Sequence, residues 1–166
     1  MEAVEREEIR GVLDGIRVLD VAAPSGAYVS RVLGDLGADV IKIENPIGGE
    51  QGRGASTDQK GVDSYYFMLL NANKRSVTLN LKDERGKDML RKLIAKADIF
   101  AENFAPGVIE KLGFSYEEVS KINPRMIYGS GSGFGLSGPN MKYPAMDLTV
   151  QAIAGIMNVT GYPDRP

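Results

Sequence analysis

The 166-residue sequence predicts an α/β protein with a Rossmann-like, doubly wound and mainly parallel sheet. Short apolar runs rich in β-branched residues recur along the chain. Each is followed by a stretch whose apolar residues repeat at helical spacing. Strands that alternate with helices pair in parallel through crossovers, and such crossovers are almost always right-handed. We therefore expect strands and helices to alternate throughout one globular unit.

The first βαβ unit is predicted between residues 16 and 43. Residues 16–21 read as a buried strand, and a turn with Pro24, Ser25 and Gly26 follows. Apolar residues at helical spacing then predict a helix that ends at Gly37 in a left-handed conformation, before a second strand at 39–43. Residues 45–64 are rich in Gly, Asp, Gln and Ser, which is typical of a long functional or mobile surface loop.

The same alternation continues in the second half of the chain. Asp83 is a plausible N-cap for a helix that reaches Lys96. The buried stripe of this helix is predicted to be Met89, Leu90, Leu93 and Ile94. Further strands are expected at 76–81, 98–102 and 125–129, and further helices at 107–112, 116–122 and 144–159.

Composition excludes several kinds of site. The chain has no cysteine and no histidine, so disulfides, thiolate metal sites and histidine acid/base chemistry are excluded, and we expect no metal. A net charge of -2 gives no general attraction to nucleic acid or to an anionic membrane. Residues 1–10 are acidic and polar, and no apolar run is long enough to span a bilayer, so we expect the cytoplasm.

Charge is unevenly distributed, and a basic surplus could serve an anionic ligand. Residues 71–98 contain eight Lys/Arg and four Asp/Glu, although a solvated helix face explains much of this surplus. Lys74 and Arg75 precede a predicted strand, where cations could meet phosphates; a solvated turn is the alternative. Lys111 lies on a short helix after a strand, and Asp147 is better explained as a helix cap than as a catalytic group.

Ligands of such sheets bind where loops leave the carboxyl ends of the strands. Four stretches are therefore candidates: 22–27, 80–82, 103–107 and 129–138. The last contains Gly133, Gly135 and Gly138 in the pattern G-x-G-x-x-G, which is found in nicotinamide-binding domains. Here it follows the fifth strand and runs into Pro139 instead of opening a helix, so nicotinamide binding is only an alternative.

Read together, these segments resemble the class III CoA-transferase family, which includes formyl-CoA, carnitine and 2-hydroxyacyl-CoA transferases. The resemblance runs from about Leu13 to the last residue, in shared order and spacing. The matching segments are LDGIRVLD (13–20), LGDLGADVIKIE (33–44), NKRSVTLNLK (73–82), ADIFAENF (97–104), LGF (112–114) and NPR (123–125). Residues 1–12 are then a polar lead, and 13–166 the N-terminal portion of a large CoA-binding Rossmann-like domain whose remainder is absent.

The resemblance implies a site for coenzyme A or acyl-CoA as substrate, with no permanently bound cofactor. Phosphates of CoA would meet the basic residues and oriented backbone amides. The CoA-binding residues that the resemblance implies are Ser25, Asn45, Arg75, Leu79, Asn80, Leu81, Lys82, Asn103, Phe104, Ala105, Lys111, Ser132, Gly133, Phe134 and Gly135. It further implies a free carboxylic acid as second substrate and an interlocked homodimer in the full-length form.

In this family an aspartate carboxylate attacks the acyl-CoA thioester, and CoA then passes to a free acid through an aspartyl intermediate. That aspartate follows a segment similar to 160–166, so we expect it beyond Pro166 and expect these residues alone to be an inactive fragment. The turn 22–26 differs from the glutamine-containing turn of formyl-CoA transferase and is closer to 2-hydroxyacyl-CoA transferases. Met146 stands where the related α-methylacyl-CoA racemases have a histidine, which favours transfer over racemisation. Binding of acyl-CoA without catalysis is the other alternative.

Overall fold

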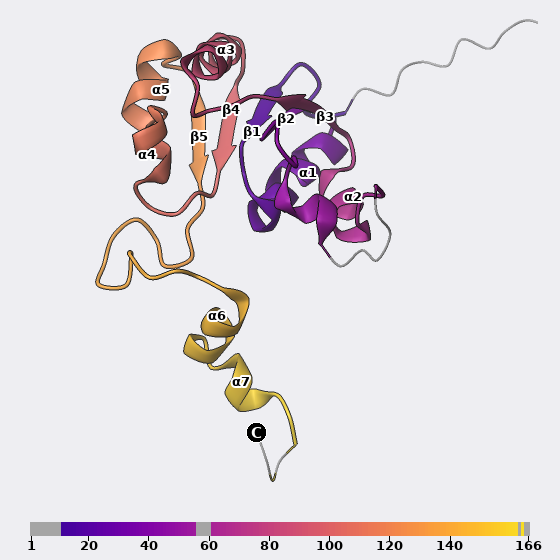
Figure 1. The fold of residues 1–166 in the computed structure, drawn as a ribbon, viewed down its shortest axis with the longest axis vertical. Helices are drawn as coiled ribbons and strands as arrows, with labels where there is room; N and C mark the ends of the chain where they lie inside the picture. The colour runs from indigo at the N-terminus through magenta and orange to yellow at the C-terminus, as the bar shows by residue number, and fades with distance from the viewer. Residues whose placement is uncertain (1–10, 56–60, 163, 165–166) are drawn as a thin grey trace, which may run out of the picture.

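Five parallel strands form the sheet of this protein, in the order β3-β2-β1-β4-β5 (Figure 1). The computed structural model describes residues 11–55, 61–162 and 164. The strands are β1 (Arg17–Asp20), β2 (Asp39–Glu44), β3 (Lys74–Thr78), β4 (Ile99–Glu102) and β5 (Ile127–Ser130). Because all pairings are parallel and helices lie between consecutive strands, the predicted Rossmann-like α/β fold is confirmed.

The central strand β1 is the point where the strand order reverses. Val18 pairs with Val40 of β2 on one side and with Ile99 of β4 on the other. The loops that follow β1 and β4 therefore leave the sheet next to each other and turn to opposite sides. In open α/β sheets a crevice forms at this place, at the carboxyl ends of the strands.

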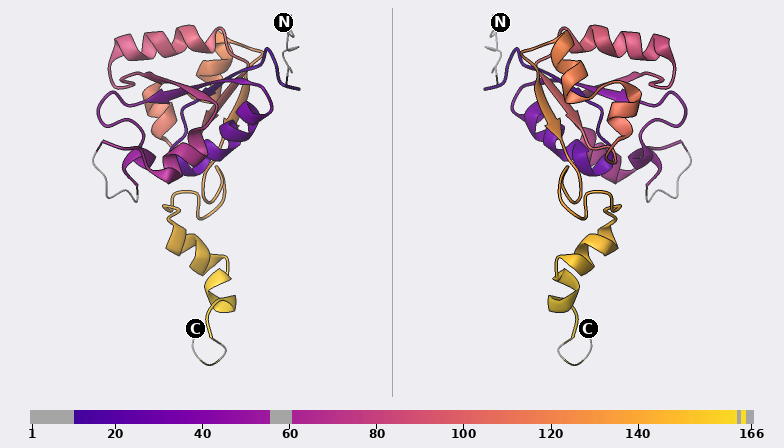
Figure 2. Two further views of the ribbon diagram at one scale, coloured as in Figure 1. Left: turned by 90° about the vertical axis from the view of Figure 1, so that its right-hand side faces the viewer. Right: turned by 90° about the vertical axis from the view of Figure 1, so that its left-hand side faces the viewer.

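Helices cover both faces of the sheet (Figures 1 and 2). The described helices are α1 (Ala27–Asp35), α2 (Tyr65–Asn71), α3 (Glu84–Ile94), α4 (Val108–Leu112), α5 (Tyr116–Ile122), α6 (Asp147–Ile153) and α7 (Ile156–Val159), of which α6 and α7 do not cover the sheet. Two short 3-10 helices, η1 (Pro24–Gly26) and η2 (Gln51–Gly54), lie in the loops after β1 and β2.

Alternation along the strands builds two apolar cores. Leu19 of β1 packs with Phe100 and with residues of α3, α4 and α5, whereas Val18 packs with Val40 and with Leu33 of α1. Successive side chains of a strand point to opposite faces, which explains this division. On the face of the sheet that α1 covers, the apolar core is small, because the next side chain of β1 on that face after Val18 is the charged Asp20.

Several local predictions are confirmed. Gly37 ends the first helix region with φ 102°, in the left-handed region. Asp83 is the N-cap of α3 and accepts a hydrogen bond from the Arg85 N–H at 2.9 Å. Leu90 and Ile94 are fully buried, but Met89 is 49% exposed, so its place in the buried stripe was wrong.

Other boundaries were predicted wrongly. The third strand was expected at 76–81; it begins at Lys74, which pairs with Val40, and ends at Thr78. The helix expected at 144–159 is split into α6 and α7 by Gly155, whose φ is 77°. Helix α2 was not predicted at all; Ser64 caps it by accepting from the Phe67 N–H. Residues 1–10 of the polar lead 1–12, and residues 163, 165 and 166 of the 160–166 segment, lie outside the described residues.

The segment that contains α6 and α7 extends away from the sheet (Figure 2). Its apolar side chains are exposed, among them Leu148 and Ile153 of α6 and Val159 of α7. In the part of the chain that the structure describes, no helix is both long and apolar enough to cross a membrane.

Candidate functional site

A cavity of about 500 Å³ opens at the carboxyl edge of the sheet. Its walls come from the β1–η1 turn, the end of β2 and the loop that follows it, the segment after β3, and helix α4. The lining residues are Val21, Ala22, Ala23, Pro24, Lys42, Ile43, Glu44, Asn45, Pro46, Ile47, Gly49, Glu50, Gln51, Leu79, Asn80, Leu81, Lys82, Phe104, Val108 and Leu112. The cavity thus lies in the crevice that the reversal of strand order creates.

Six of the residues that the sequence proposed line this cavity together: Asn45, Leu79, Asn80, Leu81, Lys82 and Phe104. The segment after β3 has a defined conformation. Asn80 accepts the Lys82 N–H on its side chain at 3.1 Å and the Asp83 N–H on its backbone carbonyl at 3.0 Å. This tight turn leads directly into the N-cap of α3 and directs residues 79–82 along the cavity wall.

Asn103, at the end of β4, holds the turn after β1. Its side-chain Oδ1 accepts the Ala23 N–H at 2.6 Å, and its Nδ2 donates to Ser25 Oγ at 3.0 Å. A side chain at Gly26 would collide with the Asn103 amide, so the close approach requires glycine there. Asn103 and Ser25, both proposed as CoA contacts, do not line the cavity; they fix the turn that does.

Arg75 lies far from this edge in the strand direction. It is the second residue of β3, and its guanidinium donates to both carboxylate oxygens of Asp39, the first residue of β2, at 2.6 and 2.7 Å. The length of β2 therefore lies between the Arg75 guanidinium and the carboxyl edge of the sheet. Lys111 is exposed on α4 between the lining residues Val108 and Leu112, and Ala105 is exposed just before that helix.

The loop that contains Ser132, Gly133, Phe134 and Gly135 follows β5 and does not line the cavity. It starts beside the site, because the Gly131 N–H donates to the Glu102 carbonyl at 2.9 Å. Phe134 meets Tyr143 edge to face, with ring centroids 6.4 Å apart. A side chain at Gly133 would overlap Ala145, so this loop is folded closely onto the segment before α6.

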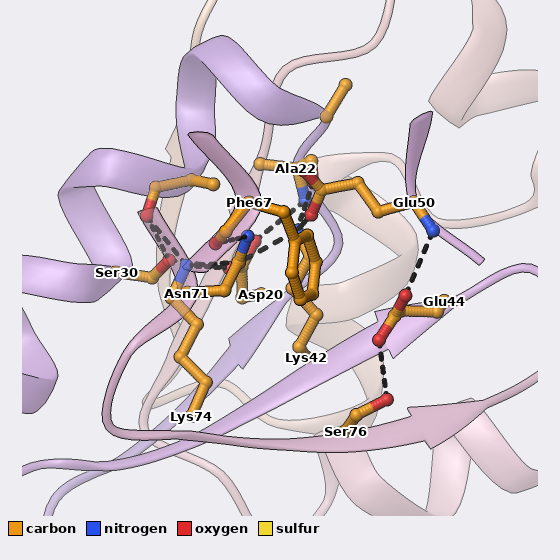
Figure 3. Close-up of polar contacts among 12 residues, drawn as sticks. Asp20, Ala22, Ser30, Lys42, Glu44, Glu50, Phe67, Asn71, Lys74 and Ser76 are labelled. Atoms are coloured by element: carbon orange, nitrogen blue, oxygen red, sulfur yellow. Dashed lines mark hydrogen bonds and ion pairs between the residues drawn. The ribbon is translucent and has the colours of Figure 1, made fainter. Parts of the chain in front are cut away.

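A buried cluster of charges lies under the turn after β1 (Figure 3). The Lys74 ammonium donates to Asp20 Oδ2 at 2.8 Å, to the Ala27 carbonyl at 2.7 Å and to Asn71 Oδ1 at 3.0 Å. Burial lowers the pKa of Lys74, and the charge of Asp20 opposes this effect. All three ammonium hydrogens have acceptors, so this lysine is a structural member of the cluster and does not reach the cavity.

Lys42 of β2 completes the cluster. Its ammonium donates to the Ala22 carbonyl at 2.6 Å and lies 3.5 Å from Asp20 Oδ2 and 2.6 Å from Glu50 Oε2. The contact with Glu50 is an ion pair without hydrogen-bond alignment, and neither Glu50 oxygen has a hydrogen-bond partner among the described residues. A buried charge is costly unless an opposite charge compensates it, and Lys42 and Glu50 compensate each other in this way.

A second polar group fixes the loop after β2. Glu44 accepts from Arg53 Nε at 2.7 Å, from Ser76 Oγ at 2.6 Å and from the Glu50 N–H at 2.9 Å. The Arg53 hydrogen bond, helped by Ser76 and the Glu50 amide, lowers the pKa of Glu44 to about 2. Arg53 also bonds Asp63 and lies 4.0 Å from the Phe67 ring centroid, which ties the loop to α2.

Several lining residues escaped the sequence analysis, most clearly Lys42 and Glu50. One signal was present: Lys42 and Glu44 share the strand face of buried Val40, where a charged side chain has to find buried partners. The sequence gives no such signal for Glu50, because it lies in a loop whose apolar residues do not recur at a regular spacing. Val108 and Leu112 were assigned only to a short helix.

The site has apolar walls with cations at its rim. Leu79, Leu81, Ile43 and Phe104 supply apolar surface, and the Lys82 side chain is exposed at the edge. Such a cavity suits an elongated ligand with an apolar or flat part and a charged, anionic part. Within the described residues there is no group of three or more Asp or Glu that could hold a metal ion.

Comparison with known proteins gives the decisive observation, because the family model "CoA-transferase family III" matches residues 13–166. The chain belongs to CoA-transferase family III. Among curated members, the acetyl-CoA:oxalate CoA-transferase of Acetobacter aceti is 48% identical over 158 residues, which are 95% of this chain and 40% of that protein. The formyl-CoA:oxalate CoA-transferase of Streptomyces coelicolor is 47% identical over 155 residues, 93% of this chain and 37% of the relative.

Solved structures from two bacteria share the fold of this chain. A CAIB/BAIF family protein from Brucella suis superimposes with a TM-score of 0.87 at 40% identity, over 94% of this chain and 42% of that one. Rv3272 from M. tuberculosis gives 0.85 at 38% identity, over 95% and 44%. The chain therefore spans about two fifths of the length of the relatives that it matches.

Proposed function

We propose that this chain supplies the CoA-binding part of a CoA transferase that moves CoA from an acyl-CoA thioester to a free carboxylic acid. The observation that supports this most is the cavity at the carboxyl edge, where Leu79, Asn80, Leu81, Lys82 and Phe104 converge. The family resemblance of the sequence implies CoA contacts for these same residues. The ammonium of Lys82 and the exposed Lys111 would balance phosphate charge.

The chemistry is proposed to run through an aspartate outside these 166 residues. Its carboxylate oxygen would attack the thioester carbonyl carbon, and the CoA thiolate would leave to give a mixed anhydride. The thiolate would then attack the aspartyl carbonyl, expel the original acyl group as a carboxylate and form an aspartyl-CoA thioester. The acceptor acid would repeat the two steps in reverse order, so that no net redox change or cofactor is needed.

Two further proposals follow from the shares of length. Because the relatives are more than twice as long, the chain is proposed to be one portion of a longer protein. The family resemblance is the ground on which we propose that this longer protein acts as a homodimer. It is proposed to be inactive alone. Aspartyl-CoA formation by residues 1–166, detected by mass spectrometry after incubation with an acyl-CoA, would refute the inactivity.

Binding tests the core of the proposal. In the complete gene product, calorimetric titration should show CoA binding and no NAD binding. Lys82→Met should weaken CoA binding by about tenfold, since one contact between a charge and a phosphate is lost. Lys121→Met is the matched control, because Lys121 is exposed on α5 and paired with Glu118. Absence of CoA binding in the wild type would reject the proposal.

The acceptor acid is a separate question. The names of two similar relatives, both oxalate CoA-transferases, favour oxalate, whereas the turn 22–26 resembles that of 2-hydroxyacyl-CoA transferases. We propose a small carboxylic acid and expect oxalate to be accepted. Transfer assays with formyl-CoA and acetyl-CoA as donors, and oxalate or a 2-hydroxy acid as acceptor, distinguish the two readings.

A further inference from the structure

Two segments that line the cavity meet one buried ammonium group. Ala22 belongs to the turn after β1, and Glu50 belongs to the loop after β2. The Lys42 ammonium is 2.6 Å from the Ala22 carbonyl oxygen and 2.6 Å from Glu50 Oε2, so it bridges the two segments (Figure 3). Asp20 of β1 makes the third contact, with its Oδ2 3.5 Å from the Lys42 ammonium nitrogen.

Lys42 itself cannot serve as an anion-binding residue. Its side chain is only 2% exposed, although the residue contributes to the cavity lining. Its ammonium donates to the Ala22 carbonyl and forms ion pairs with Asp20 and Glu50, so its contacts are with buried groups of the cluster. Any effect of Lys42 on a ligand must therefore act through the turn and the loop.

The charges of the buried cluster balance only when Lys42 is present. The buried cluster holds two carboxylates, Asp20 and Glu50, and two ammonium groups, Lys42 and Lys74. Loss of Lys42 would remove the ion-pair partner of the buried Glu50 carboxylate, whose oxygens have no hydrogen-bond partner among the described residues and would keep only the more distant charge of Lys74. An uncompensated buried carboxylate moves toward water, and the loop would move with it.

We propose that Lys42 is a positioning residue for the cavity: it sets the distance between the β1–η1 turn and the loop after β2, and thereby the affinity for CoA. This inference rests on the proposed function, because CoA is the ligand. The turn and the loop form walls of the same cavity, so a shift of either one changes its shape. Small displacements of positioned groups have large effects on affinity and rate.

Lys74 provides a matched control inside the same cluster. Its side chain is as buried as that of Lys42, and it lies nearer to Asp20 Oδ2, at 2.8 Å against 3.5 Å. Within the described part of the chain it forms no hydrogen bond or ion pair with Ala22 or Glu50, and it does not line the cavity. In the complete gene product, Lys42→Met should weaken CoA binding by about tenfold or more. Lys74→Met should lower the melting temperature comparably but change the CoA Kd by less than about threefold.

A second pair of variants guards against misfolding of Lys42→Met. Glu50→Gln keeps the shape of the side chain but removes the charge, and it should also weaken CoA binding. In the double variant the two losses should be less than additive, because both residues act through one ion pair. Wild-type affinity in Glu50→Gln, fully additive losses, or an equal loss in Lys74→Met would overturn the inference.

Hydrogen exchange gives a readout without ligand. Amides of segments 22–26 and 45–51 should exchange faster in Lys42→Met, and those of 45–51 should be unchanged in Lys74→Met. Unchanged exchange in both segments of Lys42→Met would contradict the positioning role. If the wild type fails to bind CoA while exchange responds as stated, the proposed function fails and the positioning role of Lys42 stands.

Discussion

Asn103 Oδ1 accepts the backbone N–H of Ala23 at 2.6 Å, so the end of β4 fixes the turn that follows β1. These residues are 80 positions apart in sequence and meet at the reversal of strand order. The Asn103 amide also donates to Ser25 Oγ. Both halves of the amide are thus used on a wall of the cavity and not inside it.

Asn103→Ala should destabilise the protein by about 0.5–1.5 kcal/mol, because the exposed Ala23 N–H loses its acceptor in the protein. Asn103→Asp should cost less, since a carboxylate oxygen can accept from Ala23 and the Ser25 hydroxyl can donate to it. Chemical denaturation of the two variants measures the difference. Equal losses would show that the hydrogen bond to Ala23 contributes little.

Acid should weaken the protein through Glu44. Its pKa is about 2 in the folded state and near 4.5 in an unfolded chain, so its stabilisation is complete above pH 4.5. As the pH falls from 4.5 toward 2, a stabilisation of roughly 3 kcal/mol at most is lost. Chemical denaturation at a series of pH values measures this loss of stability between pH 4.5 and 2.

Arg53→Met should reduce that acid dependence, because the arginine hydrogen bond is the main cause of the lowered pKa. Arg125→Met is the control, since Arg125 is exposed in the turn before β5 and has no ion-pair partner among the described residues. An identical loss of stability in acid in wild type and Arg53→Met would assign the pH dependence to other carboxylates.

Leu90 and Met89 are neighbours on α3 with opposite surroundings. Leu90 is fully buried among β-strand and helix residues, whereas Met89 is 49% exposed. Leu90→Ala should lower the free energy of unfolding by about 2–5 kcal/mol. Met89→Ala should change it by about 0.5 kcal/mol or less. Similar losses for both variants would contradict the burial of Leu90 and the exposure of Met89 in the middle of α3.

Gly86 allows α3 to lie against the segment after β3. A side chain there would overlap the Asn80 carbonyl oxygen, and Asn80 lines the cavity. Gly86→Ala should therefore destabilise the protein despite the better helix propensity of alanine, and should weaken CoA binding. At Gly54 the added methyl meets no atom within 4 Å, so Gly54→Ala is the control. Gain of stability in Gly86→Ala would contradict the close approach.

The sequence was sufficient for the order of the five strands, because apolar period and turn residues are local properties, but it missed helix α2. It was insufficient for β3, which begins at Lys74 because β2 offers a parallel partner from Val40 onward. Met89 fitted the helical stripe, but the neighbouring elements cover only Leu90 and Ile94. Boundaries and burial of this kind depend on tertiary partners, which periodicity does not contain.

The candidate site divides in the same way. Residues 79–82 were placed at the end of the strand predicted at 76–81, and Phe104 follows the strand predicted at 98–102; all of them line the cavity. Lys42 and Glu50 were missed because their importance arises from each other and from Asp20, which are distant in sequence. Asn103 was identified as a site residue, but only the structure shows that its amide is occupied by the turn.

The sheet order also has a consequence for synthesis on the ribosome. Strand β1 has β2 as an early partner, but its other edge waits for β4; Arg17 and Asp98, bonded at the start of these strands, are 81 residues apart. At about 5–20 residues per second, this interval is roughly 4–16 s. For that time the central strand has an open edge, on which a wrong strand can pair. The step most exposed to misfolding is therefore the late closure of β4 onto β1.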